Sequence, residues 1–457
     1  MPEDGATISG YLNKMKQEQK LLTPSWTRRW FSLEGAELKY YSTEQSLIPS
    51  KVIDLLSIDS VRAFDTGDHG VYSFILKTPT RSYLLRADSE GDMKRWLRRR
   101  YISLLSGLPI MDKRGRLLTC RYERLKELRR MVIVHGLPLE SEEEANGIEK
   151  MTLRGRVWKM LLGLDDDNLE NKQSYKRVVA LGPSKNDADI RNDTFRTFRG
   201  DPSFAKRVPE DTLVRLLNAF IHQHGNVCKD GRDESEQPYR YFQGLNILCA
   251  PFLYVLPEED AYIAFCALVT QHCPRYVAPQ LAGVHVACGL VDRCLQTLDY
   301  KLYKHLMNKG ITAKIYAYPI ILSFFACIPP LPELLHVWDI LLAMGVHFVV
   351  VLSTAHVILL RSELLTTDAH LMNKLNLRET PPLNAKRLIY LALQLLHRLP
   401  DDLHFEIARH PFQHPDSFDS ICLPSSILDI VMEKVKKRKK TVCERRVPGE
   451  IKPPWKL

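Results

Sequence analysis

The hydrophobic pattern of this chain changes its period near residue 105, and this change constrains the fold more than any other feature. Residues 6 to about 105 contain segments such as RRWFSLEG, LKYYST and YSFILKT, in which apolar and polar residues alternate between short turns. Such alternation is typical of strands with one buried face. From about Tyr122 onward, long apolar-periodic segments are separated by proline and glycine, which favours helices. The pattern therefore predicts a β-rich module followed by a helical one.

A helix is expected to close the β-rich module. The sequence EGDMKRWLRRRYISLL (90–105) places its apolar side chains on one helical face and its cations on the other; the apolar ones are Met93, Trp96, Leu97 and Tyr101. Such a helix can cover one end of a small barrel, and we expect Trp96 to plug that end.

The formal charge of +10 favours phosphate-rich partners, and the cations are concentrated in three runs, at 94–100, 114–130 and 434–446. The last run lies in a polar, proline-rich tail, residues 431–457, which is too polar to pack and is expected to be disordered and solvated. The helical half shows no basic, aromatic-bearing stripe, so no nucleic-acid partner is expected.

The ten cysteines have irregular spacings without a C-x-x-C pair, which favours free thiols in a reducing compartment. The N-terminus has no secretory pattern, so we expect a cytoplasmic protein. Residues 341–360 carry no formal charge and approach the length of a membrane span. Gly345 and several polar residues interrupt this run, which favours two buried helices separated by a turn.

Three histidines near the C-terminus, His404, His410 and His414, are the one cluster that suggests a metal. Pro411 and Pro415 break any regular face, and no nearby cysteine or carboxylate completes a ligand set. No metal site is therefore expected.

The first module resembles a pleckstrin homology domain. The resemblance rests on G-Y-L-x-K at 10–14, on W-T-R-R-W-F-S-L at 26–33 and on Trp96 in the closing helix. It implies a β-barrel with a C-terminal helix over residues 1–108. It also implies candidate phosphoinositide contacts at Lys14 and Arg29, and the nearby Lys16, Lys20 and Arg28 are further candidates that could compensate for a missing cation.

Thr27 stands where that family would place a further cation. A docking module with a solvated basic rim, making at most weak contact with phosphoinositide or anionic membrane, is therefore favoured over specific lipid binding.

The second module contains four motifs in a fixed order: LRGRVWKMLLG (153–163), IRNDTFRTF (190–198), YFQGLN (241–246) and HVWDILLAMG (336–345). Their order resembles the TBC domain of Rab GTPase-activating proteins over roughly residues 130–400. The resemblance implies an all-α domain, here expected at 131–430 after a basic connector at 109–130. It implies a small GTPase as partner and catalytic roles for Arg196 and Gln243.

These two residue types suit GTP hydrolysis, which spreads charge over the transferred phosphoryl group and needs an aimed water. A guanidinium such as that of Arg196 is permanently charged and planar, so it can bridge phosphate oxygens in the transition state. The amide of Gln243 offers a donor and an acceptor that can hold the water. No cofactor of the chain's own is needed, because the GTPase supplies GTP and Mg²⁺.

Five neighbouring residues are expected to support these two. Asp193 lies three positions before Arg196, a helical spacing that lets its carboxylate orient the arginine. Gly244 permits a close backbone approach. The remaining supporters are Ile190 of the first signature, Tyr241 packed beside Gln243, and Asn246 bonding within the loop.

Four further residues match family positions and are assigned to architecture. Trp158 and Trp338 are expected in the core, and Arg154 and Asp339 are expected to form a buried ionic support.

The segment around 315–345 resembles the fungal mitotic-exit and septation branch of TBC proteins. In that branch the TBC protein acts with a scaffold subunit at the spindle pole to restrain a Ras-like GTPase. Rab control on endomembranes is the alternative partnership. Two other functions stay open: a catalytically silent TBC scaffold or effector, and a membrane adaptor driven by the first module.

Overall fold

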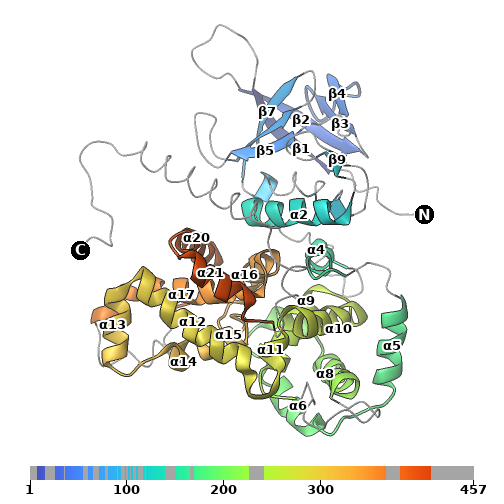
Figure 1. Cartoon of the computed structure of the whole chain (residues 1–457). Helices are drawn as coiled ribbons and strands as arrows, with labels where there is room; N and C mark the ends of the chain where they lie inside the picture. The colour runs from blue at the N-terminus through green and yellow to red at the C-terminus, as the bar shows by residue number, and fades with distance from the viewer. Residues whose placement is uncertain are drawn as a thin grey trace. The chain divides into compact units, whose positions relative to one another are not determined.

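The computed structural model describes residues 8–15, 26–34, 37–54, 60–64, 72–77, 81–89, 91–93, 98, 101–102, 104–105, 110–111, 117–118, 120–138, 151–164, 169–225, 241–366 and 381–412 (Figure 1). The described residues divide into two compact units, 8–138 and 151–412, and each is described by itself. The limits expected for the individual domains stay predictions.

The first unit is built on a seven-stranded antiparallel sheet with the order β4-β3-β2-β1-β7-β6-β5. Its strands are β1 (Ile8–Met15), β2 (Trp26–Glu34), β3 (Glu37–Tyr41), β4 (Lys51–Asp54), β5 (Ser60–Phe64), β6 (Ser73–Lys77) and β7 (Ser82–Arg86). Every second residue of β7 is buried, as expected for a strand with one face on a core. The predicted β-rich fold of this module is thus confirmed.

Helical residues after β7 complete the core of this sheet. Met93 is buried in one cluster with Leu12, Phe31 and Leu85. Tyr101 is fully buried, and its hydroxyl donates to the Gly136 carbonyl at 2.9 Å, at the end of α2 (Arg121–His135). Trp96, the expected plug, lies outside the described residues. A short ribbon of β8 (Ile110–Met111) and β9 (Leu117–Leu118) precedes α2.

The second unit is helical, as predicted. Its first half comprises α4 (Leu153–Leu161), α5 (Leu169–Val179), α6 (Asp187–Thr194), α7 (Pro202–Arg207), α8 (Glu210–His224), α9 (Leu245–Val255), α10 (Glu258–Ala267), the π-helical turn η3 (Leu268–His272), α11 (Pro274–Val277) and the 3₁₀ turn η4 (Pro279–Leu281). Its second half comprises α12 (Ala282–Leu298), α13 (Tyr300–Asn308), α14 (Ala313–Tyr316), α15 (Tyr318–Leu322), α16 (Leu331–Met344), η5 (Val346–Phe348), α17 (Val349–Leu359), α18 (Arg361–Thr366), α20 (Ala385–Leu396) and α21 (Asp401–Arg409).

The uncharged run 341–360 forms two buried helices rather than one. Helix α16 ends at Met344, Gly345 has a φ of 99°, and α17 begins after the turn η5. Gly345 is needed there because a side chain is rarely tolerated at positive φ. No helix in the part of the chain that the structure describes is both long and apolar enough to cross a membrane.

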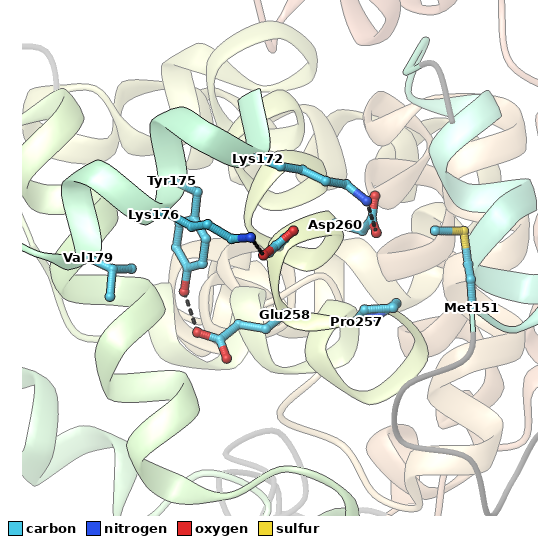
Figure 2. A pocket seen from close by; sticks show the side chains of 9 residues that line it. Met151, Lys172, Tyr175, Lys176, Val179, Pro257, Glu258 and Asp260 are labelled. Carbon is cyan, nitrogen blue, oxygen red and sulfur yellow. Dashed lines mark hydrogen bonds and ion pairs between the residues drawn. The ribbon is translucent and has the colours of Figure 1, made fainter. Parts of the chain in front are cut away.

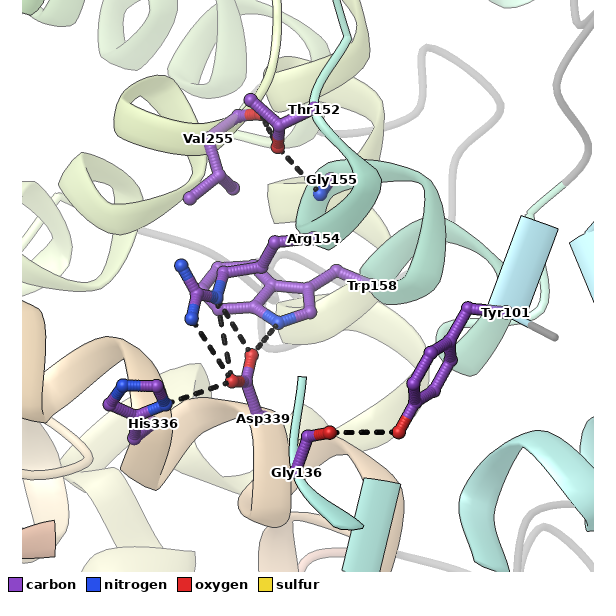
Figure 3. A network of polar contacts seen from close by, with 9 residues as sticks. All are labelled: Tyr101, Gly136, Thr152, Arg154, Gly155, Trp158, Val255, His336 and Asp339. Carbon is purple, nitrogen blue, oxygen red and sulfur yellow. Dashed lines mark hydrogen bonds and ion pairs between the residues drawn. The ribbon is translucent and has the colours of Figure 1, made fainter. Parts of the chain in front are cut away.

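The core of the helical unit is organised around Trp158 and Trp338, whose ring centroids lie 5.6 Å apart. Both rings are fully buried and both pack edge-on against Phe252. Beside them, Arg154 Nε donates to Asp339 Oδ1 at 3.1 Å, and Trp158 Nε1 donates to the same oxygen at 2.8 Å (Figure 3).

Asp339 keeps its charge inside this core. Burial by itself would raise its pKa, but Arg154 and His336 outweigh burial, so the pKa of Asp339 is lowered. The network ties α4 to α16. It thereby joins two motifs that the sequence places far apart.

Candidate functional site

The first half of the site is the turn that follows α6. Ile190 is fully buried and fixes this helix in the core. The buried hydroxyls of Thr194 and Thr197 donate to the carbonyls of Ile190 and Asp193 at 2.7 and 3.1 Å. The Asp193 carbonyl also accepts the Arg196 N–H at 3.1 Å, so backbone and hydroxyl bonds close this turn together. Two buried threonines therefore hold the turn rigid while the residues between them face solvent.

Arg196 projects from this turn. Its Nη2 donates to Asp193 Oδ1 at 2.7 Å, and its Nε donates to the Asn192 carbonyl at 3.2 Å. The side chain is nevertheless 61% exposed, whereas that of Asp193 is 10% exposed. A charge-assisted bond to a nearly buried carboxylate orients the guanidinium and leaves part of it open to a partner.

The second half of the site is the segment that leads into α9. Tyr241 is half-buried, and its hydroxyl donates to Asp193 Oδ2 at 2.9 Å. Burial, together with the bond to Asp193, raises the pKa of Tyr241. Its phenol therefore stays protonated and remains a donor. Both oxygens of Asp193 are thus occupied, one by each motif.

Asn246 forms a second link between the two motifs. Its Nδ2 donates to the Asp193 carbonyl at 3.2 Å and to Thr197 Oγ1 at 2.8 Å, while its Oδ1 accepts the Gly244 N–H at 3.1 Å. Asn246 is buried, so each of these bonds is shielded from water. The loop that carries Gln243 is therefore tied to the turn that carries Arg196.

Gln243 lies in the turn that immediately precedes α9. The side chain is exposed, and within the described residues no hydrogen bond holds its amide. Gly244, which follows, has a φ of 125°, where other residues are strained. A Cβ at this position would also lie 3.4 Å from Leu322 Cδ2. The glycine thus allows the sharp turn that presents the amide of Gln243.

The sequence predicts Tyr241 only as a neighbour of Gln243, and it contains no signal for the bond to Asp193. Thr194 and Thr197 were not identified as functional either. The threonine at each end of the T-F-R-T segment could have indicated a hydrogen-bonded turn around Arg196. A threonine hydroxyl in a helical turn can donate to the carbonyl four residues earlier.

A separate hollow of about 700 Å³ lies in the helical unit beside α5 and the start of α10 (Figure 2). Asp260 accepts from Lys172 and from the buried Lys159, and Lys176 pairs with Glu259. Glu258 is similarly bound by Arg215 and Tyr175. Because its acidic side chains are all paired with cations of the fold, this hollow is a structural charge network rather than a ligand site.

The candidate lipid residues of the first unit separate into two groups. In the first group, Lys14 lies over the Tyr40 ring and near Arg81 and Arg29. Burial contributes most to lowering the pKa of Lys14, and the positive charges of Arg81 and Arg29 lower it further. Arg28 instead pairs with Asp88 at 3.1 Å, so its charge is compensated. Lys16 and Lys20 lie outside the described residues. Arg81, which the sequence does not single out, acts electrostatically on Lys14, and Thr27 lies opposite Lys14 in the sheet.

His410 of the histidine cluster serves the core. Its Nδ1 lies 2.6 Å from the Ile407 carbonyl and its Nε2 lies 2.7 Å from the Tyr276 hydroxyl. His414 lies outside the described residues. Among the residues that the structure describes, no group of three histidine, cysteine or carboxylate side chains could hold a metal ion.

Seven cysteines of the described part are free thiols. Burial raises the pKa of several of them, and it raises that of Cys294 to about 12.

Comparison with known proteins identifies a family model for each of the two modules. The model of the Rab-GTPase-TBC domain matches residues 151–365, and that of the PH domain matches residues 6–99. The chain is 37% identical over 297 residues to the mitotic check point protein BUB2 of Dictyostelium discoideum, covering 64% of this chain and 76% of that protein.

Two fungal proteins are similar over a comparable share of the chain. Cell division control protein 16 of Schizosaccharomyces pombe is 37% identical, with 63% of this chain and 88% of that protein covered. The mitotic check point protein BUB2 of Saccharomyces cerevisiae is 31% identical, with 63% of this chain and 92% of that protein covered.

Proposed function

The chain belongs to the Rab-GTPase-TBC family and activates a small GTPase, and from this premise we propose that it completes the GTPase's active site with Arg196 and Gln243. One observation supports this assignment above others. The Asp193 carboxylate binds Arg196 through one oxygen and Tyr241 through the other, which joins the two signatures in one site.

Arg196 is proposed to stabilise the transition state. Negative charge shifts onto the oxygens around the transferred phosphoryl group as the bond to the leaving phosphate breaks, and a guanidinium placed there lowers the barrier. Asp193 holds Arg196 in one orientation before the partner binds, so less conformational entropy is lost on binding. The permanent charge of arginine makes this contribution independent of pH near neutrality.

Gln243 is proposed to position the attacking water. Its amide carries both an acceptor for a water proton and a donor for a water or phosphate oxygen. The side chain is exposed, and within the described residues it is not engaged elsewhere. GTP and Mg²⁺ belong to the partner, so this chain contributes positioning and charge and no covalent chemistry.

We further propose that the cellular role is control of mitotic progression. The similarity to proteins named as mitotic check point and cell division control proteins supports this role over Rab control of membrane traffic. The partner would then be a septation or mitotic-exit GTPase of the Ras type, with a scaffold subunit as a second partner at the spindle pole.

The decisive experiment is single-turnover GTP hydrolysis with the full chain in excess over each of a panel of Rab and septation GTPases. We expect Arg196→Ala to lower the maximal rate by roughly 10³-fold or more. Gln243→Ala should lower it by a similar order, because a misplaced water is as damaging as a missing charge.

Equal rates for wild type and both variants on every GTPase would contradict the catalytic assignment. Binding to a GTPase without acceleration would instead identify a silent scaffold or effector. If acceleration occurs only when a scaffold subunit is added, the two residues must still be required in that mixture.

A further inference from the structure

A large apolar side chain stands next to Arg196 on the surface of the helical unit. Phe195 is 54% exposed, whereas most other phenylalanine side chains of the described part of this unit are buried. It is the C-cap of α6 and keeps helical backbone angles, and its N–H donates to the Arg191 carbonyl at 3.1 Å. Phe195 is therefore held on ordered helical backbone rather than on a loose loop.

The turn forces Phe195 outward together with Arg196. Thr194 and Thr197 are buried, and Phe198 turns back at a φ of 47° to pack against Phe204, with ring centroids 5.0 Å apart. Phe195, Arg196 and Arg199 are all exposed, and the Arg199 guanidinium lies over the Phe195 ring, so the three residues share one face. We name Phe195, Arg196 and Arg199 the finger face.

The finger face is apolar and cationic at the same time. The Arg199 guanidinium lies 4.6 Å from the centre of the Phe195 ring, a cation–π contact. Within the described residues neither Arg199 nor Phe195 contacts an acidic side chain, so the only carboxylate bound to this face is that of Asp193 on Arg196. A partner surface that suits it carries an apolar spot bordered by negative charge.

We propose that Phe195 is a docking residue for the GTP-bound GTPase and sets the affinity of the complex, with Arg199 as its supporting cation. The proposal rests on the proposed function. If Arg196 enters the GTP site, the adjacent residue on the same exposed face must lie against the protein surface around the nucleotide. Burying an exposed aromatic ring there stabilises the complex without touching the reacting phosphate.

This role differs from that of Arg196 in a measurable way. An interaction made equally in the bound ground state and in the transition state changes affinity and leaves the maximal rate unchanged. Since about half of the Phe195 side chain remains to be buried, removing the ring should weaken binding roughly five- to tenfold.

The chain offers a matched control. Phe405 on α21 is also 54% exposed, and it also stacks with an arginine, Arg409, at 4.8 Å. Its replacement removes the same ring, exposure and cation–π contact from a face that carries neither Arg196 nor Gln243.

The experiment is single-turnover hydrolysis with increasing concentrations of the full chain, on the GTPase of the panel that wild type accelerates most. Phe195→Ala should raise the half-maximal concentration roughly five- to tenfold at an unchanged maximal rate. Phe195→Leu should restore most of the affinity because it keeps apolar area, and Phe405→Ala should match wild type.

The outcomes separate the two proposals. An unchanged half-maximal concentration for Phe195→Ala, with Arg196→Ala inactive, overturns the docking role alone. A fall in maximal rate for Phe195→Ala without a change in affinity also overturns it, because Phe195 would then act by placing Arg196. If Arg196→Ala equals wild type or no GTPase is accelerated, the proposed function fails and the docking role fails with it.

Discussion

The hydroxyl of Tyr241 donates to Oδ2 of Asp193 at 2.9 Å, while Oδ1 of the same carboxylate accepts Arg196 Nη2 at 2.7 Å. One side chain therefore connects two signatures that lie 48 positions apart. Because Asp193 is nearly buried and Arg196 is mostly exposed, the carboxylate is the fixed element and the arginine is the element that reaches outward.

Removing the Tyr241 hydroxyl tests this connection. We expect Tyr241→Phe to lower the maximal rate of GTPase activation by roughly 10- to 100-fold, since one hydrogen bond to a charged group contributes about 1.5–3 kcal/mol and the ring is kept. Asp193→Asn should lower the rate further, because it weakens the charge-assisted bond to Arg196. Single-turnover hydrolysis at saturating concentrations of the chain measures both effects.

Thermal unfolding of both variants serves as the control for that measurement. If Tyr241→Phe keeps the full rate while Asp193→Asn loses it, Asp193 orients Arg196 without help from Tyr241.

Gly244 provides a backbone test of Gln243. Gly244→Ala places a side chain at a φ of 125° and 3.4 Å from Leu322. We expect a cost of about 1–3 kcal/mol from backbone strain, and a lower rate because the shifted backbone moves the amide of Gln243. Gly200→Ala is the matched control, because a Cβ there meets nothing within 4 Å. Equal rates for the two variants would show that Gln243 does not depend on this turn.

The buried pair of Arg154 and Asp339 is expected to matter for stability alone. The Asp339 side chain is 2% exposed, so Asp339→Ala leaves the guanidinium buried without its partner. We expect a loss of roughly 3–5 kcal/mol in the free energy of unfolding. Glu406→Ala, which removes the half-exposed ion pair with Arg293, should cost less than about 1 kcal/mol. Urea unfolding measures both, and similar losses would contradict the assignment.

Acid should destabilise the helical unit through His410. Its Nδ1 faces a carbonyl, which can only accept, so Nδ1 carries the proton and Nε2 accepts from the Tyr276 hydroxyl. Burial lowers the pKa of His410 to about 3. The unfolded chain binds a proton near pH 6.5 and the folded chain does not, so stability is complete above about pH 6.5 and falls below it by up to about 1.4 kcal/mol per pH unit.

Urea unfolding between about pH 7 and 5 measures this slope. His410→Gln should flatten it, and His404→Gln, within α21 but only half-buried, should not. A slope that is the same in both variants would assign the acid sensitivity to other groups. His356 is the next candidate, since burial lowers its pKa to about 4.

Weak binding to anionic membranes should depend on Lys14 and Arg29. Each cation near an anionic surface contributes about 1 kcal/mol, so Lys14→Ala with Arg29→Ala should weaken binding of the full chain to phosphoinositide vesicles by roughly tenfold or more. Arg28→Ala is the control, because Asp88 already compensates Arg28. Vesicle flotation at low and high salt measures the membrane binding of each variant. An equal loss of binding in all variants would show that the face carrying Lys14 is not the membrane-binding face.

The sequence by itself predicted the two fold classes and their order, because strand and helix periods follow from local backbone geometry. It also indicated that Asp193 and Arg196 share a face, since residues three apart in a helix are neighbours. The buried pair of Arg154 and Asp339 was expected only through resemblance to a known family.

The tertiary structure alone decided which distant groups meet. Tyr241 reaches Asp193, Asn246 reaches Thr197, and Arg81 takes its place near Lys14 only after separate elements have packed. These contacts depend on how α6, α9 and the strands of the sheet fit together. Local spacing carries no information about such pairs, because packing is settled by the shapes of all the side chains at once. For the same reason the exposure of Phe195 beside Arg196 follows from the fold and not from the motif.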